Sequence, residues 1–159
     1  MNFLYIKYLF QATNQHGVHS PFVYSLVTKA LYKKQKTTEH SLLSEWKKEY
    51  SFSFRKQKII NKALNYFNDE TYKVNHDNAF RSKKTIYFNL KEKNTREILE
   101  KANSCSFFII DNIGASNALK NQWEAVRCAP IFSISIDFFN IGFLFVRKEQ
   151  VKEDFKIRI

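Results

Sequence analysis

Glycine and proline are scarce in this chain of 159 residues, which contains three glycines and two prolines. Loops that cradle nucleotide phosphates need several glycines close together, because the backbone itself must approach the phosphate. Gly17, Gly114 and Gly142 are widely separated along the chain. No glycine-rich phosphate loop can therefore be assigned to any part of the sequence.

Cysteine and long apolar runs are also scarce. Cys105 and Cys128 are the only cysteines, and neither belongs to a C-x-x-C pair or lies near other metal-ligand types, so we expect two small buried residues rather than a zinc site or disulfide. No apolar run reaches the roughly 20 residues of a membrane span. Residues 1–10 are apolar but contain Lys7, and no cleavage site of small residues follows. We expect a cytoplasmic protein with no membrane association.

The composition is that of a globular protein. Hydrophobic residues make up 44% of the chain and aromatic residues 16%, which argues against disorder. A chain of this length can bury about two thirds of its unfolded surface around one core. We expect a single domain, 1–159, made of an N-terminal helical part (1–68), a polar loop (69–84) and an α/β part (85–159).

The positive charge is concentrated in the N-terminal part of the chain. Residues 1–93 contain 17 lysines and arginines against 7 acidic residues, whereas residues 94–159 contain 9 against 8. Two interpretations remain open. The excess can be a solvated lysine-rich surface of the kind that an A/T-rich genome produces, or it can bind an anionic partner such as a nucleic acid.

Helical periodicity predicts four helices before residue 69. They are expected over residues 2–12, from Pro21 to about Lys34, over 40–50 and over 55–68. Ser20 followed by Pro21 is a typical helix start, in which we expect the serine oxygen to cap free backbone N–H groups. Residues 69–84 are mostly polar and predict a loop with at most one weak strand near 71–74.

The second half of the chain predicts an α/β fold of about four to five strands. Strands are expected over 85–90 and 106–110, separated by a helix that Asn94 and Glu97 cap reciprocally, and a single intervening helix implies parallel neighbours. After a helix over 116–127, two apolar runs at 131–137 and 141–147 are too close for a crossover. They predict an antiparallel hairpin at a sheet edge.

Two separated segments resemble one known family. Asp111-Asn112 after a strand, Trp123 in the next helix, the run Ser135 to Phe139 and the closing segment 141–150 resemble the C-terminal part of class I S-adenosylmethionine-dependent methyltransferases. More narrowly, they are similar to a bacterial group related to catechol O-methyltransferase. Residues 16–23 resemble the N-terminal signature of the same group, and together the matches cover about half the chain.

The resemblance implies a truncated Rossmann-like methyltransferase sheet with N-terminal helices. The family places a glycine-rich turn and three strands after the helix that corresponds to 55–68. This chain has no glycine there, and only residues 69–84 are available for all three strands. The resemblance therefore implies a shortened form that lacks most of the cofactor-binding lobe, and we expect no bound cofactor.

In metal-dependent members of the family, an Asp on the fourth strand and an Asp-Asn pair on the fifth bind a divalent cation. Asp111 and Asn112 match that pair, and oxygen ligands of this kind suit magnesium. Asn89 stands where the first Asp is expected, so the resemblance implies a weak or vestigial site. The alternative is that Asp111 caps the helix near Ser116 or fixes the loop through backbone N–H groups.

His16, His19 and Asp137 are further candidates. The two histidines could act as bases near neutral pH, or hydrogen bonds from their rings could fix the N-terminal segment against the sheet. Asp137 ends an apolar strand, where a carboxylate needs a partner or solvent. His76 and Asp77 lie in the polar loop, where we expect them to be solvated.

Three functions remain open from the sequence. The first is a degenerate methyltransferase-like protein that does not bind S-adenosylmethionine and acts as a scaffold or partner-binding module. The second is an active O-methyltransferase that uses S-adenosylmethionine and a divalent cation such as magnesium, with its site completed by oligomerisation. The third is nucleic-acid binding by the basic N-terminal half. Loss of the central strands also predicts that the N-terminal helices cover an exposed sheet edge or that the chain forms a homodimer through it.

Overall fold

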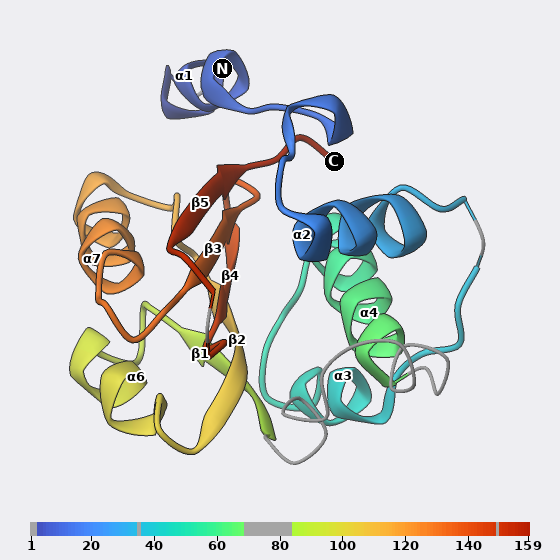
Figure 1. Cartoon of the computed structure of the whole chain (residues 1–159). Helices are drawn as coiled ribbons and strands as arrows, with labels where there is room; N and C mark the ends of the chain where they lie inside the picture. Colours follow the sequence, from blue (N-terminus) through green and yellow to red (C-terminus); the bar gives the residue numbers. More distant parts are fainter. Residues whose placement is uncertain (1–2, 35, 69–83, 149) are drawn as a thin grey trace. The chain divides into compact units, whose positions relative to one another are not determined.

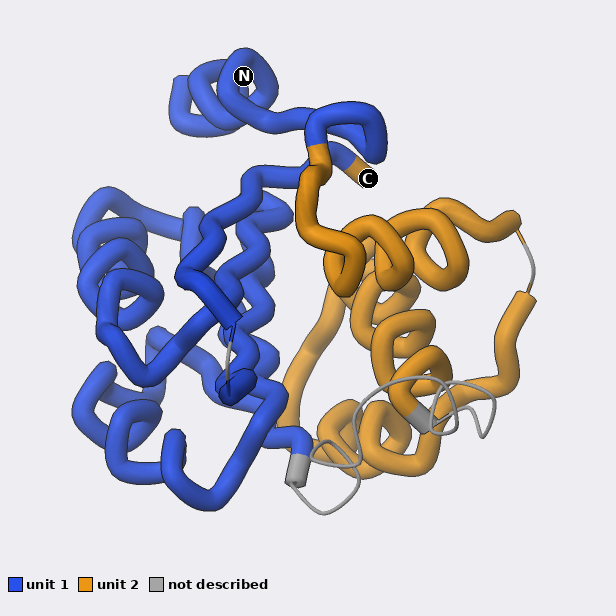
Figure 2. Tube along the Cα trace, in the orientation of Figure 1, with its two compact units in different colours: residues 1–17, 82–158 blue, residues 18–81, 159 orange. Residues whose placement is uncertain are grey.

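The computed structural model describes residues 3–34, 36–68, 84–148 and 150–159, which form two compact units (Figure 2). Of the described residues, 3–17 and those from 84 to 158 form the α/β unit, and those from 18 to 68 together with 159 form the helical unit. The N-terminal helix thus belongs to the same unit as the sheet. The weak strand expected near 71–74, and His76 and Asp77, lie outside the described residues. The expectation of a single domain stays a prediction.

The α/β unit is built on a five-stranded mixed sheet with the order β1-β2-β4-β3-β5 (Figure 1). The strands are β1 (Lys84–Asn89), β2 (Cys105–Asp111), β3 (Ile134–Asp137), β4 (Ile141–Phe145) and β5 (Glu153–Lys156). β1 and β2 are parallel, as the sequence predicts, and β3 and β5 are parallel to them. Only β4 runs in the opposite direction.

The predicted hairpin of β3 and β4 is present, but its expected place at the sheet edge is wrong. β4 pairs with both β2 and β3, and β5 pairs with β3 on the outer side. The sequence of β5, Glu-Asp-Phe-Lys, contains too few apolar residues to predict a strand. Hydrogen bonds between β5 and the β3 segment hold it in place: Ser135 Oγ donates to Asp154, and the Glu153 N–H donates to the Ser133 carbonyl at 2.8 Å.

Two capped helices cover one face of the sheet, α6 (Thr95–Lys101) and α7 (Asn117–Arg127) (Figure 1). Asn94 caps α6 as predicted, by accepting a hydrogen bond from the Glu97 N–H at 3.2 Å. The reciprocal bond expected from Glu97 to the Asn94 N–H does not form, because the Glu97 carboxylate pairs with Lys93 at 3.2 Å instead. Ser116 caps α7 through the Leu119 N–H at 3.2 Å.

Large apolar side chains fill the space between these helices and the sheet. Trp123 is fully buried and packs on Gly142, where a Cβ atom would lie 2.5 Å from the indole ring. A side chain at position 142 would therefore push α7 away from β4. On the opposite face, Phe107 stacks against Phe145 at 4.7 Å and meets Phe143 edge-on at 5.1 Å. The central strands β2, β3 and β4 are therefore buried along their whole lengths.

The N-terminal segment is attached to the β3–β5 side of the sheet. Helix α1 (Phe3–Gln11) precedes a short 3-10 turn, η1 (Gln15–Gly17). Tyr8 donates its hydroxyl hydrogen to the carbonyl of Ile157, and Thr13 forms an isolated parallel bridge with Ile157. These bonds join residues that are almost 150 positions apart in the sequence.

The helical unit contains α2 (Pro21–Leu26), a π-helical continuation η2 (Val27–Leu31), α3 (Ser41–Trp46) and α4 (Phe54–Asn68). The predicted helix over 40–50 is shorter, because α3 ends at Trp46 and turns follow. Its cap is the neutral ring of His40, whose Nδ1 accepts from the Leu42 N–H at 3.2 Å. Burial lowers the pKa of His40, which favours this neutral form.

Two expectations about single residues are wrong. Ser20 does precede α2, but its hydroxyl is buried and makes no cap hydrogen bond. The helix start therefore depends on Pro21 and on backbone contacts. Cys105 is buried as expected, whereas Cys128 is exposed at the C-cap of α7.

None of the helices in the described ranges is long and apolar enough to cross a membrane.

Candidate functional site

The carboxyl ends of four parallel strands meet at one edge of the sheet. Each of these strands ends in a polar residue: Asn89 on β1, Asp111 on β2, Asp137 on β3 and Lys156 on β5. Asn89 is paired with Asp111 in the strand register, and Asp137 with Lys156. Open α/β sheets hold ligands at this edge. The two pairs form two separate polar sites.

The first site is the Asn89 cluster, which we define as Tyr87, Asn89, Glu92, Asp111 and Asn112. It brings together the three residues that the resemblance implies for a metal site. Asn112 donates from its amide to Asn89 Oδ1 at 2.7 Å. Asn89 in turn donates from Nδ2 to a carboxylate oxygen of Glu92, also at 2.7 Å.

Both carboxylate oxygens of Asp111 accept hydrogen bonds from the protein. Oδ1 accepts from the Asn112 N–H at 2.6 Å, and Oδ2 accepts from the hydroxyl of Tyr87 at 2.8 Å. Asn112 has a φ angle of 63°, a left-handed conformation that asparagine tolerates better than most residues. The expectation that Asp111 fixes this loop through a backbone N–H is confirmed. The expectation that it caps α7 is wrong, because Ser116 does so.

A divalent cation fits the Asn89 cluster poorly. Asn89 uses both ends of its amide: Nδ2 donates to Glu92, and Oδ1 accepts from Asn112 and from the Lys91 N–H at 3.1 Å. Hard cations need several oxygen ligands, preferably charged. Within the ranges that the structure describes, no group of three His, Cys, Asp or Glu side chains is placed to hold a metal ion.

The second site is the α1 cavity, a hollow of about 350 Å³ within the α/β unit. Helices α1 and α7, strand β5 and the loops after β2 and β3 all contribute to it. Its lining is Leu4, Lys7, Tyr8, Gln11, Gly114, Lys120, Glu124, Arg127, Phe139 and Lys156.

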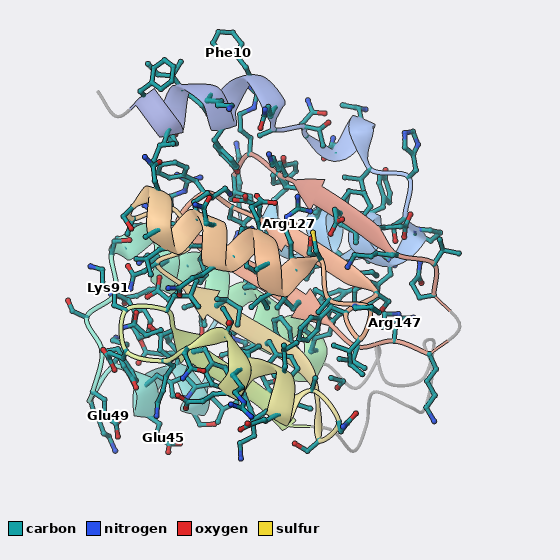
Figure 3. The ribbon with its side chains drawn as sticks, turned by 90° about the vertical axis from the view of Figure 1, so that its left-hand side faces the viewer. Phe10, Glu45, Glu49, Lys91, Arg127 and Arg147 are labelled. Atoms are coloured by element: carbon teal, nitrogen blue, oxygen red, sulfur yellow. The ribbon has the colours of Figure 1, made fainter. Side chains whose placement is uncertain are left out.

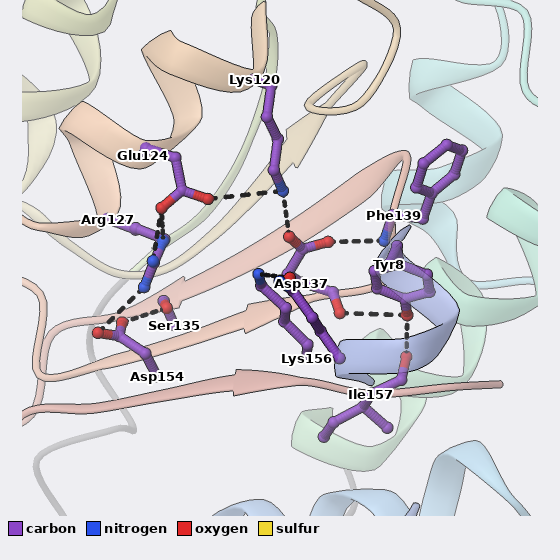
Figure 4. A network of polar contacts seen from close by, with 11 residues as sticks. Tyr8, Lys120, Glu124, Arg127, Ser135, Asp137, Phe139, Asp154, Lys156 and Ile157 are labelled. Atoms are coloured by element: carbon purple, nitrogen blue, oxygen red, sulfur yellow. Dashed lines mark hydrogen bonds and ion pairs between the residues drawn. The ribbon is translucent and has the colours of Figure 1, made fainter. Parts of the chain in front are cut away.

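A chain of ion pairs forms the α7 side of this cavity (Figure 4). Lys120 pairs with the buried carboxylate of Asp137 and lies 3.6 Å from Glu124. Arg127 binds Glu124 at 2.5 Å and Asp154 at 3.1 Å. Burial alone would lower the pKa of Arg127, but these two carboxylates outweigh it and raise that pKa. The cations of α7 are therefore already neutralised, and Asp137 has the partner that its place predicts.

Two lysines on the opposite side of the cavity have no carboxylate partner in the described part of the chain. Lys156 Nζ donates to the side-chain carbonyl of Gln11 at 2.6 Å. Lys7 makes no hydrogen bond or ion pair with any described residue. Its neighbour Phe10 projects from α1 away from the sheet (Figure 3), so α1 has an exposed outer face and an inner face toward the cavity.

The aromatic wall of the cavity is held in a strained conformation. Phe139 has a φ angle of 79°, in the left-handed region that bulky residues avoid. Its N–H donates to Asp137 Oδ1 at 2.7 Å, and its ring lies 4.8 Å from Tyr5 and 5.5 Å from Tyr8. Gly114 permits this arrangement, because a Cβ there would lie 2.3 Å from the Phe139 carbonyl oxygen.

The histidine candidates do not join either site. His16 and His19 are exposed, and neither ring forms a hydrogen bond with the residues that the structure describes. The role proposed for them, fixing the N-terminal segment to the sheet, is performed by Tyr8 and Thr13. Sequence reasoning missed Lys7, Lys120 and Lys156. One of these could have been found from the sequence. Lys120, Glu124 and Arg127 are spaced by four and three residues, which places them on the same face of a helix.

The helical unit has a basic cavity of its own, of about 190 Å³. Lys29, Lys33 and Lys62 line it together with Ala30, Thr37, Asn65 and Tyr66. Lys62 is buried and donates to the carbonyls of Leu31 and Lys33, the free acceptors at the end of η2. Burial, and then the nearby charge of Lys58, lower the pKa of Lys62.

Comparisons with known proteins give no match: no family model, curated protein or solved structure matches this chain.

Proposed function

We propose that this protein is a methyltransferase-like protein that does not bind S-adenosylmethionine and acts as a binding module. Two features support the family part of the proposal. Parallel β1 and β2 are followed by a closing antiparallel hairpin, and Asn89, Asp111 and Asn112 meet at one sheet edge. Both are what the resemblance implies for a shortened sheet of this family.

The hydrogen bonds of the Asn89 amide support the other part of the proposal, that the protein is not an active metal-dependent methyltransferase. This side chain donates to Glu92 and accepts from Asn112 at the same time. An aspartate, the residue that a metal-dependent methyltransferase needs here, has no hydrogen to donate and would face the Glu92 carboxylate with a like charge. The edge is therefore organised as an internal hydrogen-bond network, which removes the need for a cation.

Isothermal titration with S-adenosylmethionine, with and without magnesium, tests this proposal. We expect no binding at concentrations up to about 1 mM, a Kd at which binding is worth only ~4 kcal/mol. Micromolar binding, or methyl transfer to a catechol acceptor by any oligomer of the chain, would overturn it and favour the active transferase.

Replacing Asn89 by Asp provides a sharper test. We expect wild-type protein to show no magnesium-dependent change in melting temperature, and Asn89→Asp to be destabilised without magnesium and partly restored by it, because the cation then neutralises three carboxylates. Asn103→Asp adds the same charge at an exposed turn position and serves as the control. Magnesium stabilisation of the wild-type protein to the same extent as of Asn89→Asp would contradict the proposal.

Binding of a polyanion such as single-stranded nucleic acid by the helical unit is a second candidate. Residues 18–68 contain ten lysines and arginines against three glutamates, and three of the lysines surround one cavity. Lysines clustered at a concave surface suit contacts with backbone phosphates.

Fluorescence anisotropy with a labelled single-stranded oligonucleotide across a salt series tests this candidate. The double variant Lys29→Gln/Lys33→Gln should bind more weakly and flatten the salt dependence by about 1–2 in logarithmic slope. The control is Lys93→Gln/Lys101→Gln, which removes the same charge from the α/β unit. Equal effects of both variants, or binding that does not depend on salt, would exclude a specific role of this cavity.

A further inference from the structure

We infer that the α1 cavity binds a small organic anion, a carboxylate or phosphate ester with an aromatic body. The inference rests on the proposed role as a binding module and names the ligand class. It places the ligand at the β3–β5 end of the sheet edge, away from the Asn89 cluster. Nothing in the methyltransferase resemblance assigns a site there.

The size of the cavity indicates a small molecule. A volume of about 350 Å³ lies at the lower end of the range of about 300–1,000 Å³ that small-molecule sites span. It greatly exceeds the roughly 30 Å³ that one water molecule occupies in the liquid. A bare inorganic anion would leave most of this space, and most of the apolar lining, without contacts.

The distribution of charge indicates an anion. Four cations and one carboxylate line the cavity, and that carboxylate, Glu124, is bound by both Lys120 and Arg127. Lys120 is further neutralised by Asp137. The charge that remains available to a ligand is on Lys7 of α1 and Lys156 of β5, which line the same cavity. A ligand oxygen between these two ammonium groups would gain charge-assisted hydrogen bonds that the protein itself does not supply.

The aromatic wall indicates the nature of the ligand's body. Tyr8 and Phe139 present ring surfaces to the cavity, and Leu4 adds an aliphatic contact. The polar end of Tyr8 is already used by the carbonyl of Ile157, so the tyrosine offers its ring rather than its hydroxyl. Aromatic rings pack with favourable geometry against such walls.

The strain at Phe139 supports a binding role. A bulky residue in the left-handed region costs about 1–2 kcal/mol, and such strain persists where the surrounding structure enforces it, often at ligand clamps. Here the Asp137 carboxylate holds the Phe139 N–H and two tyrosines hold the ring. The ring is thereby fixed before any ligand arrives, which lowers the entropy lost on binding.

Calorimetric titration of the full chain with phenyl phosphate, benzoate, inorganic phosphate and benzyl alcohol tests the inference. We expect phenyl phosphate or benzoate to bind with a Kd of about 1 mM or tighter, and both inorganic phosphate and benzyl alcohol to bind at least about tenfold more weakly. Whether phenyl phosphate or benzoate binds more tightly identifies the anionic group. Each of the variants Lys7→Gln and Lys156→Gln should weaken binding about tenfold, the loss of one charge-assisted hydrogen bond.

Lys101→Gln, which removes an exposed charge on α6, is the matched control and should leave binding unchanged. Because Lys156 also holds Gln11, circular dichroism must show that its variant is folded, and the exposed Lys7 provides an independent test. Absence of binding by both aromatic anions, equal binding of inorganic phosphate, or equal loss in the Lys101 control would overturn the inference. It would leave the proposed function standing, because that proposal is tested by S-adenosylmethionine binding, methyl transfer and magnesium-dependent stability, none of which depends on the α1 cavity.

Discussion

The two polar sites at the carboxyl edge of the sheet are built from similar residues but differ in what their polar groups contact. In the Asn89 cluster, amide and carboxylate groups are bonded to one another, so the cluster is closed. At the α1 cavity, carboxylates neutralise the cations of α7, while Lys7 and Lys156 remain available across a hollow. A polar residue at a strand end therefore indicates a ligand site only when the rest of the protein does not already use its hydrogen bonds and charge.

Removing each strand-end carboxylate should show this difference most strongly. We expect Asp137→Ala to lower the free energy of unfolding by about 3 kcal/mol, because it leaves Lys120 without its buried partner and the Phe139 N–H without an acceptor. Asp111→Ala should lower it less, by about 2 kcal/mol, because the two described donors to Asp111 are a hydroxyl and an N–H group without charge. Urea denaturation measures both, and the reverse order would contradict the comparison.

A methyl group at Gly114 should disturb the connection between the two sites. This residue lies in the loop after β2, and its added Cβ would meet the carbonyl oxygen of Phe139 in the loop after β3. Neither a Cβ atom nor a backbone oxygen can rotate away from this contact, so the two loops must move apart. We expect Gly114→Ala to lower the free energy of unfolding by about 2 kcal/mol. Thermal melts with Ala115→Gly as the neighbouring control measure the effect, and an unchanged melting temperature would show that the loops are not held together.

Removing one hydroxyl should weaken the Asn89 cluster without affecting the α1 cavity. Tyr87→Phe deletes the donor to the Asp111 carboxylate and should lower the free energy of unfolding by about 1.5 kcal/mol, the lower end of the range for a hydrogen bond to a charged group, because the pair is only partly buried. Phenyl phosphate binding should stay within error of the wild type. A loss of binding together with stability would mean that the two sites act as one.

The smallest effect on stability is expected at Phe139. Phe139→Asn loses ring contacts with Tyr5 and Tyr8, worth about 1 kcal/mol, but relieves backbone strain of about the same size. We therefore expect a change of less than about 1 kcal/mol in the free energy of unfolding together with a clear loss of phenyl phosphate binding. Retained binding would show that the ring is not part of the ligand site.

The apolar periodicity of the sequence predicted most elements of the α/β unit. The runs around Phe108 and Phe143 could only be buried strands, and Asn94 and the Ser116 region marked helix starts that side chains do cap. Strand β5 was not predicted, because Phe155 is its only apolar residue and its position depends on pairing with β3.

The candidate site could be predicted only in part, for the same reason. The family resemblance grouped Asn89, Asp111 and Asn112 into one site, and the structure brings these three residues together at one sheet edge. Lys7 and Lys156 lie at opposite ends of the chain, and each looks like an ordinary surface lysine. They share a cavity because Tyr8 and Thr13 attach the N-terminal segment to Ile157. This contact joins the two ends of the chain, so no local sequence pattern predicts it.

Backbone amide chemical shifts recorded during a titration with phenyl phosphate would show which of the two polar sites binds the ligand. We expect shifts for Lys7, Lys120, Phe139 and Lys156, which line the α1 cavity, and none for Asn89, Asp111 or Asn112. Shifts centred on the Asn89 cluster, with the α1 cavity unaffected, would contradict this expectation.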